Sequence, residues 1–129
     1  MNNLPTTLTT SVLSTFLGDN GLVGVDLFRR EILVLQCVVA GTSFRSIHKV
    51  DSELLPNTRL ILQREVENKY DELAIKVLLN DYLVGYIPRE NNEVISRLMD
   101  AGKNFHAVVA KLEWQGTWAK LAVSVYLND

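Results

Sequence analysis

Two short apolar runs separated by only two residues are the strongest constraint on the fold. The runs cover residues 74–79 and 82–87, and the dipeptide Asn80-Asp81 joins them. Two residues make the shortest tight connection that a β-hairpin allows. The sequence therefore predicts an antiparallel hairpin over residues 74–87.

Alternation with a period of two also marks the other predicted strands. Residues 32–40 form an apolar run rich in β-branched side chains, which predicts a buried strand. Residues 59–65 predict another strand, after a loop over 41–56 that has a helical turn at 52–55. The last two predicted strands, 105–114 and 118–127, flank the turn Gln115-Gly116-Thr117. Most of the chain is thus expected to be β-structure.

Two segments have the spacing of helices. Apolar residues recur at helical spacing over residues 5–17, and the stretch from there to residue 30 reads as a turn and an extended arm. Pro88 suits a first helical turn, Glu93 favours the positive end of a helix, and Gly102 suits the position after its end. This predicts a second helix of about three turns. Short strands with two helices favour a mainly β fold, a small and partly closed barrel.

Size and charge limit the classes of function. The chain has 129 residues, 47% of them hydrophobic, which suits one domain with a core that needs no disulfide or metal. The net charge is −2, and no run of like charges is present. Broad electrostatic coating of duplex DNA is therefore disfavoured. A nucleic-acid role would need a small, locally basic pocket with stacking surfaces.

Cofactor, metal and membrane signals are weak. Cys37 is the single cysteine, so a disulfide within the chain is excluded and a buried, inert thiol is expected. His48 and His106 lie far apart and show no metal-ligand spacing, and no Gly-rich phosphate loop is present. No basic residue precedes Arg29, and no segment approaches the roughly 18 apolar residues of a membrane span. We expect no cofactor, no metal, no membrane association and a cytoplasmic location.

Three segments that follow predicted strands carry the most informative side chains. They read GTSFR at residues 41–45, NKYD at 68–71 and GYIPR at 85–89. Aromatic rings, one carboxylate and two guanidiniums could stack a base, accept a hydrogen bond from a sugar hydroxyl and hold a phosphate. The alternative is turn chemistry, in which Asn68 and Asp71 bond their own backbone. From composition alone, turn chemistry is the favoured interpretation.

The order of these segments resembles the HIRAN domain. The resemblance covers residues 34–126, and its most specific parts are NKYDELAI at 68–75 and GYIPR at 85–89. It implies an OB-like, six-stranded, partly closed barrel over residues 31–129. The N-terminal helical or extended segment, 1–30, falls outside the resemblance, and we expect it to pack on the barrel. HIRAN domains occur in DNA-remodelling helicases and as stand-alone bacterial proteins. In the helicase-attached form the domain captures a single-stranded 3′ DNA end.

Three residues would contact the DNA end directly if the family pattern applies. The resemblance implies that Tyr70 is a stacking platform for the terminal bases and that Asp71 accepts the free 3′-hydroxyl. It implies that Arg89 holds a phosphate. These roles agree with the chemistry, because stacking on an aromatic ring is worth ~1–3 kcal/mol per base and a carboxylate repels a 3′-phosphate.

Further positions complete the implied nucleic-acid site. The resemblance implies that Phe44 lines the pocket, that Asn68 shapes the turn and that Trp118 stacks on the nucleotide. Ser43 stands where DNA-end-binding members carry a basic residue, so one phosphate anchor is missing. Arg45, two positions on, would point to the same side if the segment were a strand.

The expected function is a non-enzymatic module that recognises single-stranded DNA, at its 3′-hydroxyl end, in DNA repair. Its expected partners are single-stranded DNA ends and a protein that supplies motor or nuclease activity. The alternative is a protein-interaction or regulatory domain with no nucleic-acid activity, which the apolar segment at 4–28 would favour. A requirement for a free 3′ end separates the two hypotheses.

Overall fold

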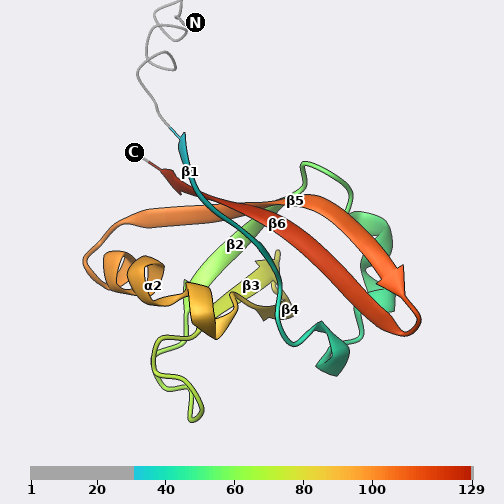
Figure 1. Ribbon diagram of the computed structural model, residues 1–129, viewed down its shortest axis with the longest axis horizontal. Coiled ribbons are helices and arrows are strands. Elements are labelled where there is room, and N and C mark those ends of the chain that lie inside the picture. Colours follow the sequence, from blue (N-terminus) through green and yellow to red (C-terminus); the bar gives the residue numbers. More distant parts are fainter. Residues whose placement is uncertain (1–30, 129) are drawn as a thin grey trace, which may run out of the picture. The chain divides into compact units, whose positions relative to one another are not determined.

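One antiparallel sheet dominates the computed structural model, which describes residues 31–128 (Figure 1). The strand order across the sheet is β1-β6-β5-β2-β3-β4. The strands are β1 (Glu31–Val38), β2 (Arg59–Arg64), β3 (Ile75–Leu79), β4 (Tyr82–Tyr86), β5 (Asn104–Gln115) and β6 (Trp118–Asn128). The expectation of a mainly β fold with six strands is confirmed. The helix expected at 5–17 and the arm after it lie outside the described residues.

The predicted hairpin over residues 74–87 is present, and the last two predicted strands form a second hairpin whose turn is one residue shorter than expected. Leu79 pairs with Tyr82 across a two-residue turn, and Gln115 pairs with Trp118 across another. The first residue of each turn, Asn80 or Gly116, has a positive φ of 55° or 65°. Turns of this kind match the twist of the flanking strands. A two-residue connection therefore both predicts a hairpin from the sequence and suits it in the structure.

The two edges of the sheet meet at a single point in the described part of the chain. Ala40, just after β1, and Tyr86 of β4 exchange backbone hydrogen bonds of 2.8 and 2.9 Å. A Cβ on Gly85 would collide with the Ala40 carbonyl oxygen, so only glycine permits this approach. The barrel is therefore joined by one bridge and is not closed by a continuous ladder.

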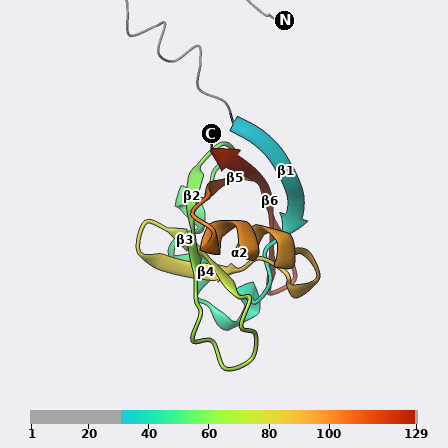
Figure 2. The same ribbon diagram turned by 90° about the vertical axis from the view of Figure 1, so that its left-hand side faces the viewer.

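Figure 2 shows the sheet curving around an interior, and buried apolar side chains form the core. Alternate residues of the strands point into it, as the period of two requires. Among the most deeply buried side chains are Val39, Leu60, Ile75, Val77, Val84, Val109, Leu121, Val123 and Val125. At about 25 cal/mol per Å² of apolar surface, this burial is the main source of stability that holds the loops in place.

Strand β1 differs from its expected burial. Ile32, Leu33 and Val34 are 48%, 49% and 42% exposed, whereas Leu35 and Cys37 pack against the core. The prediction of a fully buried strand was wrong because β1 is an edge strand whose first half extends past the core. The thiol of Cys37 is half-buried, and burial raises the pKa of Cys37 to about 11, so the group stays protonated at neutral pH.

The described helix is shorter than predicted. Helix α2 covers Glu93–Asp100, and a 3₁₀ turn, Arg89–Asn91, precedes it. Pro88 has φ −56° and ψ 142°, an extended conformation, so the helix does not begin there as expected. Its end is as predicted, because Gly102 follows with a φ of 99° and its N–H bonds the Met99 carbonyl.

The loop after β1 contains more helical turns than predicted. Three 3₁₀ turns occupy Thr42–Phe44, Ile47–Lys49 and Asp51–Glu53, and the third overlaps the turn expected at 52–55. Because the first turn leads directly into Arg45, the strand geometry proposed for Ser43 and Arg45 is wrong. Within residues 31–128 no helix is both long and apolar enough to cross a membrane.

Candidate functional site

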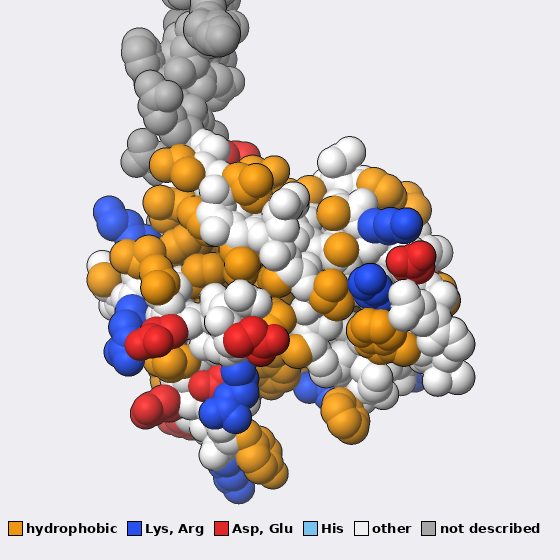
Figure 3. Space-filling model, viewed as in Figure 1, with side chains coloured by type: hydrophobic (Ala, Val, Ile, Leu, Met, Phe, Trp, Pro, Cys, Tyr) orange, Lys and Arg blue, Asp and Glu red, His pale blue; other side chains and the backbone are white. Residues whose placement is uncertain are grey.

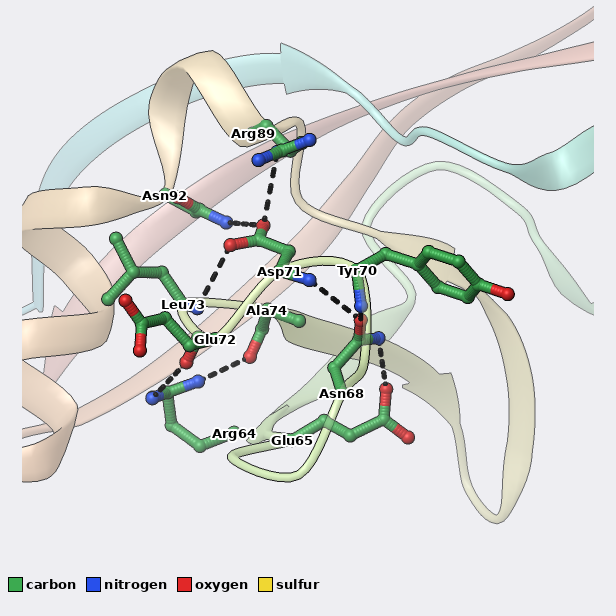
Figure 4. Close-up of polar contacts among 10 residues, drawn as sticks. All are labelled: Arg64, Glu65, Asn68, Tyr70, Asp71, Glu72, Leu73, Ala74, Arg89 and Asn92. Atoms are coloured by element: carbon green, nitrogen blue, oxygen red, sulfur yellow. Dashed lines mark hydrogen bonds and ion pairs between the residues drawn. The ribbon is translucent and has the colours of Figure 1, made fainter.

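The loop between β2 and β3 is built around the side chain of Asn68. Asn68 Oδ1 accepts hydrogen bonds from the backbone N–H groups of Tyr70, at 2.7 Å, and Asp71, at 2.9 Å. Asn68 Nδ2 donates to Glu65 Oε1 at 2.8 Å (Figure 4). These three bonds fix the path of the chain on both sides of Tyr70.

Arg64, at the end of β2, ties this loop to the rest of the domain. Its guanidinium donates to the carbonyl oxygens of Ala74, at 2.6 Å, and Glu72, at 2.9 Å. It also forms an ion pair of 2.9 Å with Asp100 in α2. The Arg64 side chain is only 11% exposed, so its contacts are strong enough to restrain the loop.

Asp71 connects the loop to the segment before α2. Its Oδ1 accepts the Leu73 N–H at 2.9 Å, and its Oδ2 accepts the Asn92 amide at 2.8 Å. Arg89 Nε lies 3.8 Å from Oδ2, and the Arg89 side chain is 75% exposed while that of Asp71 is 15% exposed (Figure 4). The Asp71 carboxylate therefore accepts the backbone hydrogen bond expected of a turn residue and also contacts two side chains from the segment before α2.

Two open cavities flank the loop. One, of about 550 Å³, is lined by Phe44, Arg45, Glu65, Glu67, Asn68, Lys69, Tyr70 and Tyr86. The other, of about 460 Å³, is lined by Asn68, Lys69, Tyr70, Asp71, Glu72, Leu73 and Arg89. We call them the Tyr86 cavity and the Arg89 cavity. Figure 3 shows basic, acidic and hydrophobic side chains intermingled on the side of the molecule where this loop projects.

Two aromatic rings at these cavities are almost fully exposed. Tyr70 is 86% exposed and Phe44 is 83% exposed. Neither ring contributes much to the core, yet the backbone of Tyr70 is held by Asn68 and that of Phe44 by a 3₁₀ turn. Rings that are exposed on restrained backbone can stack on a flat ligand without the cost of ordering a mobile loop.

The floor of the Tyr86 cavity is a charged network that sequence reasoning did not predict. The Tyr86 hydroxyl donates to Glu65 Oε1 at 2.7 Å, and the Arg45 guanidinium carbon lies 5.8 Å from the centre of the Tyr86 ring. Hydrogen bonds from Asn68 and Tyr86 lower the pKa of Glu65, whereas burial and Glu65 raise the pKa of Tyr86. Tyr86 lies in the GYIPR segment, which the sequence analysis singled out as informative. Glu65 lies in none of the three informative segments.

Ser43 and Trp118 line neither cavity. Trp118 precedes the buried Ala119 in β6, so its side chain points to the opposite face of the strand, where it is 38% exposed. The Thr42 hydroxyl donates to the Ala119 carbonyl at 2.7 Å, which places Ser43 and Trp118 next to the same contact. Six of the eight predicted site residues line the two cavities: Phe44, Arg45, Asn68, Tyr70, Asp71 and Arg89.

Histidines and metal ligands do not add to the site. The His106 ring is buried, stacks on Tyr126 at a centroid distance of 5.4 Å and has its Nδ1 2.7 Å from Asn128 Oδ1. His48 is exposed in a 3₁₀ turn. Among residues 31–128, no group of three or more His, Cys, Asp or Glu side chains is arranged to hold a metal ion.

Comparison with solved structures gives two clear matches. A crystal structure of a protein from Lactobacillus plantarum has a TM-score of 0.71 and 27% sequence identity, and the match covers 78% of this chain and 98% of that chain. The HIRAN domain of human HLTF has a TM-score of 0.58 and 23% identity, covering 76% and 78% of the two chains. The second match establishes the fold and confirms the OB-like barrel. No curated protein matches the sequence.

A comparison with protein families identifies the domain. The model described as "HIRAN domain" matches residues 32–128, about three-quarters of the chain and nearly all of the described sheet. The two segments on which the resemblance depended, 68–75 and 85–89, both lie within this range and both contribute to the cavities. The chain therefore belongs to the HIRAN domain family, whose members are generally DNA-binding modules rather than catalysts.

Proposed function

We propose that this protein captures single-stranded DNA at its 3′-hydroxyl end, with the loop over residues 65–73 as the contact surface. The carrying observation is the exposed ring of Tyr70 on a restrained loop, in the same cavity as the Asp71 carboxylate and the Arg89 guanidinium. These are the groups that a terminal nucleotide needs: a surface for the base, an acceptor for the hydroxyl and a cation for the phosphate.

Tyr70 acts as the stacking platform. Its ring is 86% exposed, and it borders both cavities, so a base can approach it from either side of the loop. Stacking on one aromatic ring contributes ~1–3 kcal/mol per base. Because every base has a flat face, this contact gives affinity without requiring a particular sequence.

Asp71 accepts the terminal hydroxyl. An ionised carboxylate offers about four acceptor positions. The Leu73 N–H, the Asn92 amide and the Arg89 guanidinium account for three contacts, which leaves one for a ligand hydroxyl. A 3′-phosphate would instead bring a second negative charge close to this carboxylate. The same carboxylate thus favours a hydroxyl end and disfavours a phosphorylated one.

Cations on both sides of the loop contact the phosphates. Arg89 is 75% exposed beside Asp71, and Lys69 borders both cavities. Arg45 borders the Tyr86 cavity only. Ser43 and Trp118, which lie outside the cavities, contact nucleotides further along the strand. With so few cations the contact is short, which agrees with the net charge of −2.

The direct test compares linear and circular single strands of one sequence. We expect the linear strand to bind and the circle, which has no end, to bind at least about tenfold more weakly, since it offers Asp71 no terminal hydroxyl. Fluorescence anisotropy with an internal label measures both. Equal affinity would contradict end capture. Absence of binding to either form would favour the protein-interaction alternative, since a protein partner site has no reason to recognise DNA.

A further inference from the structure

One oxygen of the Glu65 carboxylate has no hydrogen-bond donor in the described part of the chain. Oε1 accepts both the Tyr86 hydroxyl, at 2.7 Å, and the Asn68 amide, at 2.8 Å. No hydrogen bond reaches Oε2 from residues 31–128, although Glu65 lines the Tyr86 cavity. The two bonds to Oε1 also hold the carboxylate in one orientation. The cavity therefore presents a fixed, unused acceptor.

A donor without an acceptor belongs to another residue that lines the same cavity. The Nε–H of Arg45 is enclosed and has no hydrogen-bond partner, while Nη1 of the same guanidinium donates to the Phe44 carbonyl at 3.0 Å. Arg45 lines the same cavity as Glu65 and lies over the Tyr86 ring. Buried donors are almost always paired. Because this N–H is enclosed, a ligand in the cavity would meet the other N–H groups of the Arg45 guanidinium.

We propose that the Tyr86 cavity is a base-selective subsite that prefers cytosine or adenine to thymine at one of the last two nucleotides of the captured strand. This inference rests on the proposed function. Cytosine and adenine each carry an exocyclic amino group next to a ring nitrogen that accepts hydrogen bonds. The amino group donates to Glu65, and the ring nitrogen accepts from the guanidinium of Arg45. The exposed ring of Phe44 or Tyr70 covers the face of the base.

Thymine fits this arrangement poorly. Its single N–H lies between two carbonyl oxygens, so a carboxylate that approaches the N–H also meets two sites of negative partial charge. Glu65 is kept ionised, because hydrogen bonds from Asn68 and Tyr86 lower the pKa of Glu65, and an ionised carboxylate cannot donate to those carbonyls. The preference for cytosine and adenine thus comes from repulsion between Glu65 and the thymine carbonyls as much as from the hydrogen bond that the amino group donates to Glu65.

The experiment uses the full chain and thymidine octamers with a free 3′-hydroxyl. In separate oligonucleotides the last or the next-to-last nucleotide is replaced by dC or dA, and dissociation constants are measured by fluorescence anisotropy. We expect dC and dA to bind about tenfold more tightly than dT at one of the two positions, the usual effect of a hydrogen bond to a charged group.

Glu65→Gln tests the assignment to this residue. The variant keeps an oxygen for the bonds from Tyr86 and Asn68 but replaces the unused acceptor by an amino group, which suits a thymine carbonyl. We expect the preference for dC and dA to disappear. Glu67→Gln is the matched control, because Glu67 lines the same cavity without a hydrogen bond to this network, and we expect it to keep the preference.

The outcomes separate this inference from end capture. Equal binding of all octamers by the wild-type chain would overturn base selectivity and leave end capture intact. A preference that persists in Glu65→Gln would also overturn it, because the selectivity would then come from other residues. If no octamer binds, both proposals fail. Should Glu65→Gln prove unfolded by circular dichroism, the wild-type series decides the question by itself.

Discussion

The side-chain amide of Asn92 donates a 2.8 Å hydrogen bond to Oδ2 of Asp71, although the two residues are 21 positions apart in the chain. Asn92 is only 2% exposed and stands immediately before α2, where it does not cap the helix with its side chain. Its amide instead restrains the loop that carries Tyr70. The helix start and the proposed DNA-end site are therefore coupled through one buried contact.

Asn92→Ala should lower the free energy of unfolding by about 1–3 kcal/mol, the cost of losing a buried hydrogen bond and leaving its partner less satisfied. Urea denaturation followed by circular dichroism measures the change. The neighbouring Asn91→Ala is the control, because Asn91 is exposed and its loss should change stability by less than about 0.5 kcal/mol. Equal stabilities of the two variants would show that the Asp71 contact does not restrain the loop.

Tyr70→Ala should weaken binding of a single strand by ~1–3 kcal/mol, because it removes a stacking surface. Stability should change little, since the ring is 86% exposed. Anisotropy titration and a thermal melt together check both parts. Tyr70→Phe is the matched control: it keeps the ring and removes the hydroxyl, so its affinity should remain close to that of the wild type. A large loss of affinity in Tyr70→Phe would mean that the hydroxyl, and not the ring, makes the contact.

Trp118→Ala should weaken binding of an octamer but not of a dinucleotide with a free 3′-hydroxyl. The reason is that Trp118 lies outside both cavities, beside the turn that carries Ser43, where only a longer strand can reach. Trp114→Ala is the comparison, since Trp114 is similarly exposed, at 43%, but on the other face of the hairpin. If Trp118→Ala weakens the dinucleotide equally, the ring contacts the terminal nucleotide directly.

Local patterns were sufficient to predict the hairpin over residues 74–87, the last two strands and the turn at Asn68 and Asp71. Asn80 and Gly116 begin two-residue turns, and a turn of that length fixes the pairing of its neighbours whatever lies elsewhere in the chain. The exposure of Ile32 was not predictable in this way, because it depends on where β1 lies in the sheet. The predicted start of α2 was also wrong. Proline suits the first turn of a helix and an extended position before a helix equally well, and Pro88 is extended.

The candidate site was predicted only where a motif carried it. Tyr70, Asp71 and Arg89 lie in two short segments that the family pattern marks, and they line one cavity. Glu65 was missed because its role depends on Tyr86, 21 positions away, and on the turn at Asn68. A carboxylate at the end of a strand has no local signature for such a contact. Hydrogen-bond networks between residues far apart in the chain can be recognised only once the fold is known.

Stability should fall in acid partly through Glu65. Hydrogen bonds from Asn68 and Tyr86 lower the pKa of Glu65 in the folded chain, so the unfolded chain binds this proton more readily. The stabilisation is complete at neutral pH and is lost as the pH falls through the ordinary range of a glutamate carboxyl and below it. Urea midpoints measured from neutral to about pH 3 should therefore depend less on pH in Glu65→Gln than in the wild type. An unchanged dependence would contradict this role.

In the proposed function, the carboxylate of Asp71 selects a hydroxyl at the 3′ end of a single strand. The most direct measurement compares two octamers of one sequence, one ending in a 3′-hydroxyl and one in a 3′-phosphate, against the wild-type chain. We expect the hydroxyl form to bind at least about tenfold more tightly, because the phosphate places negative charge beside Asp71. Equal dissociation constants for the two octamers would contradict it.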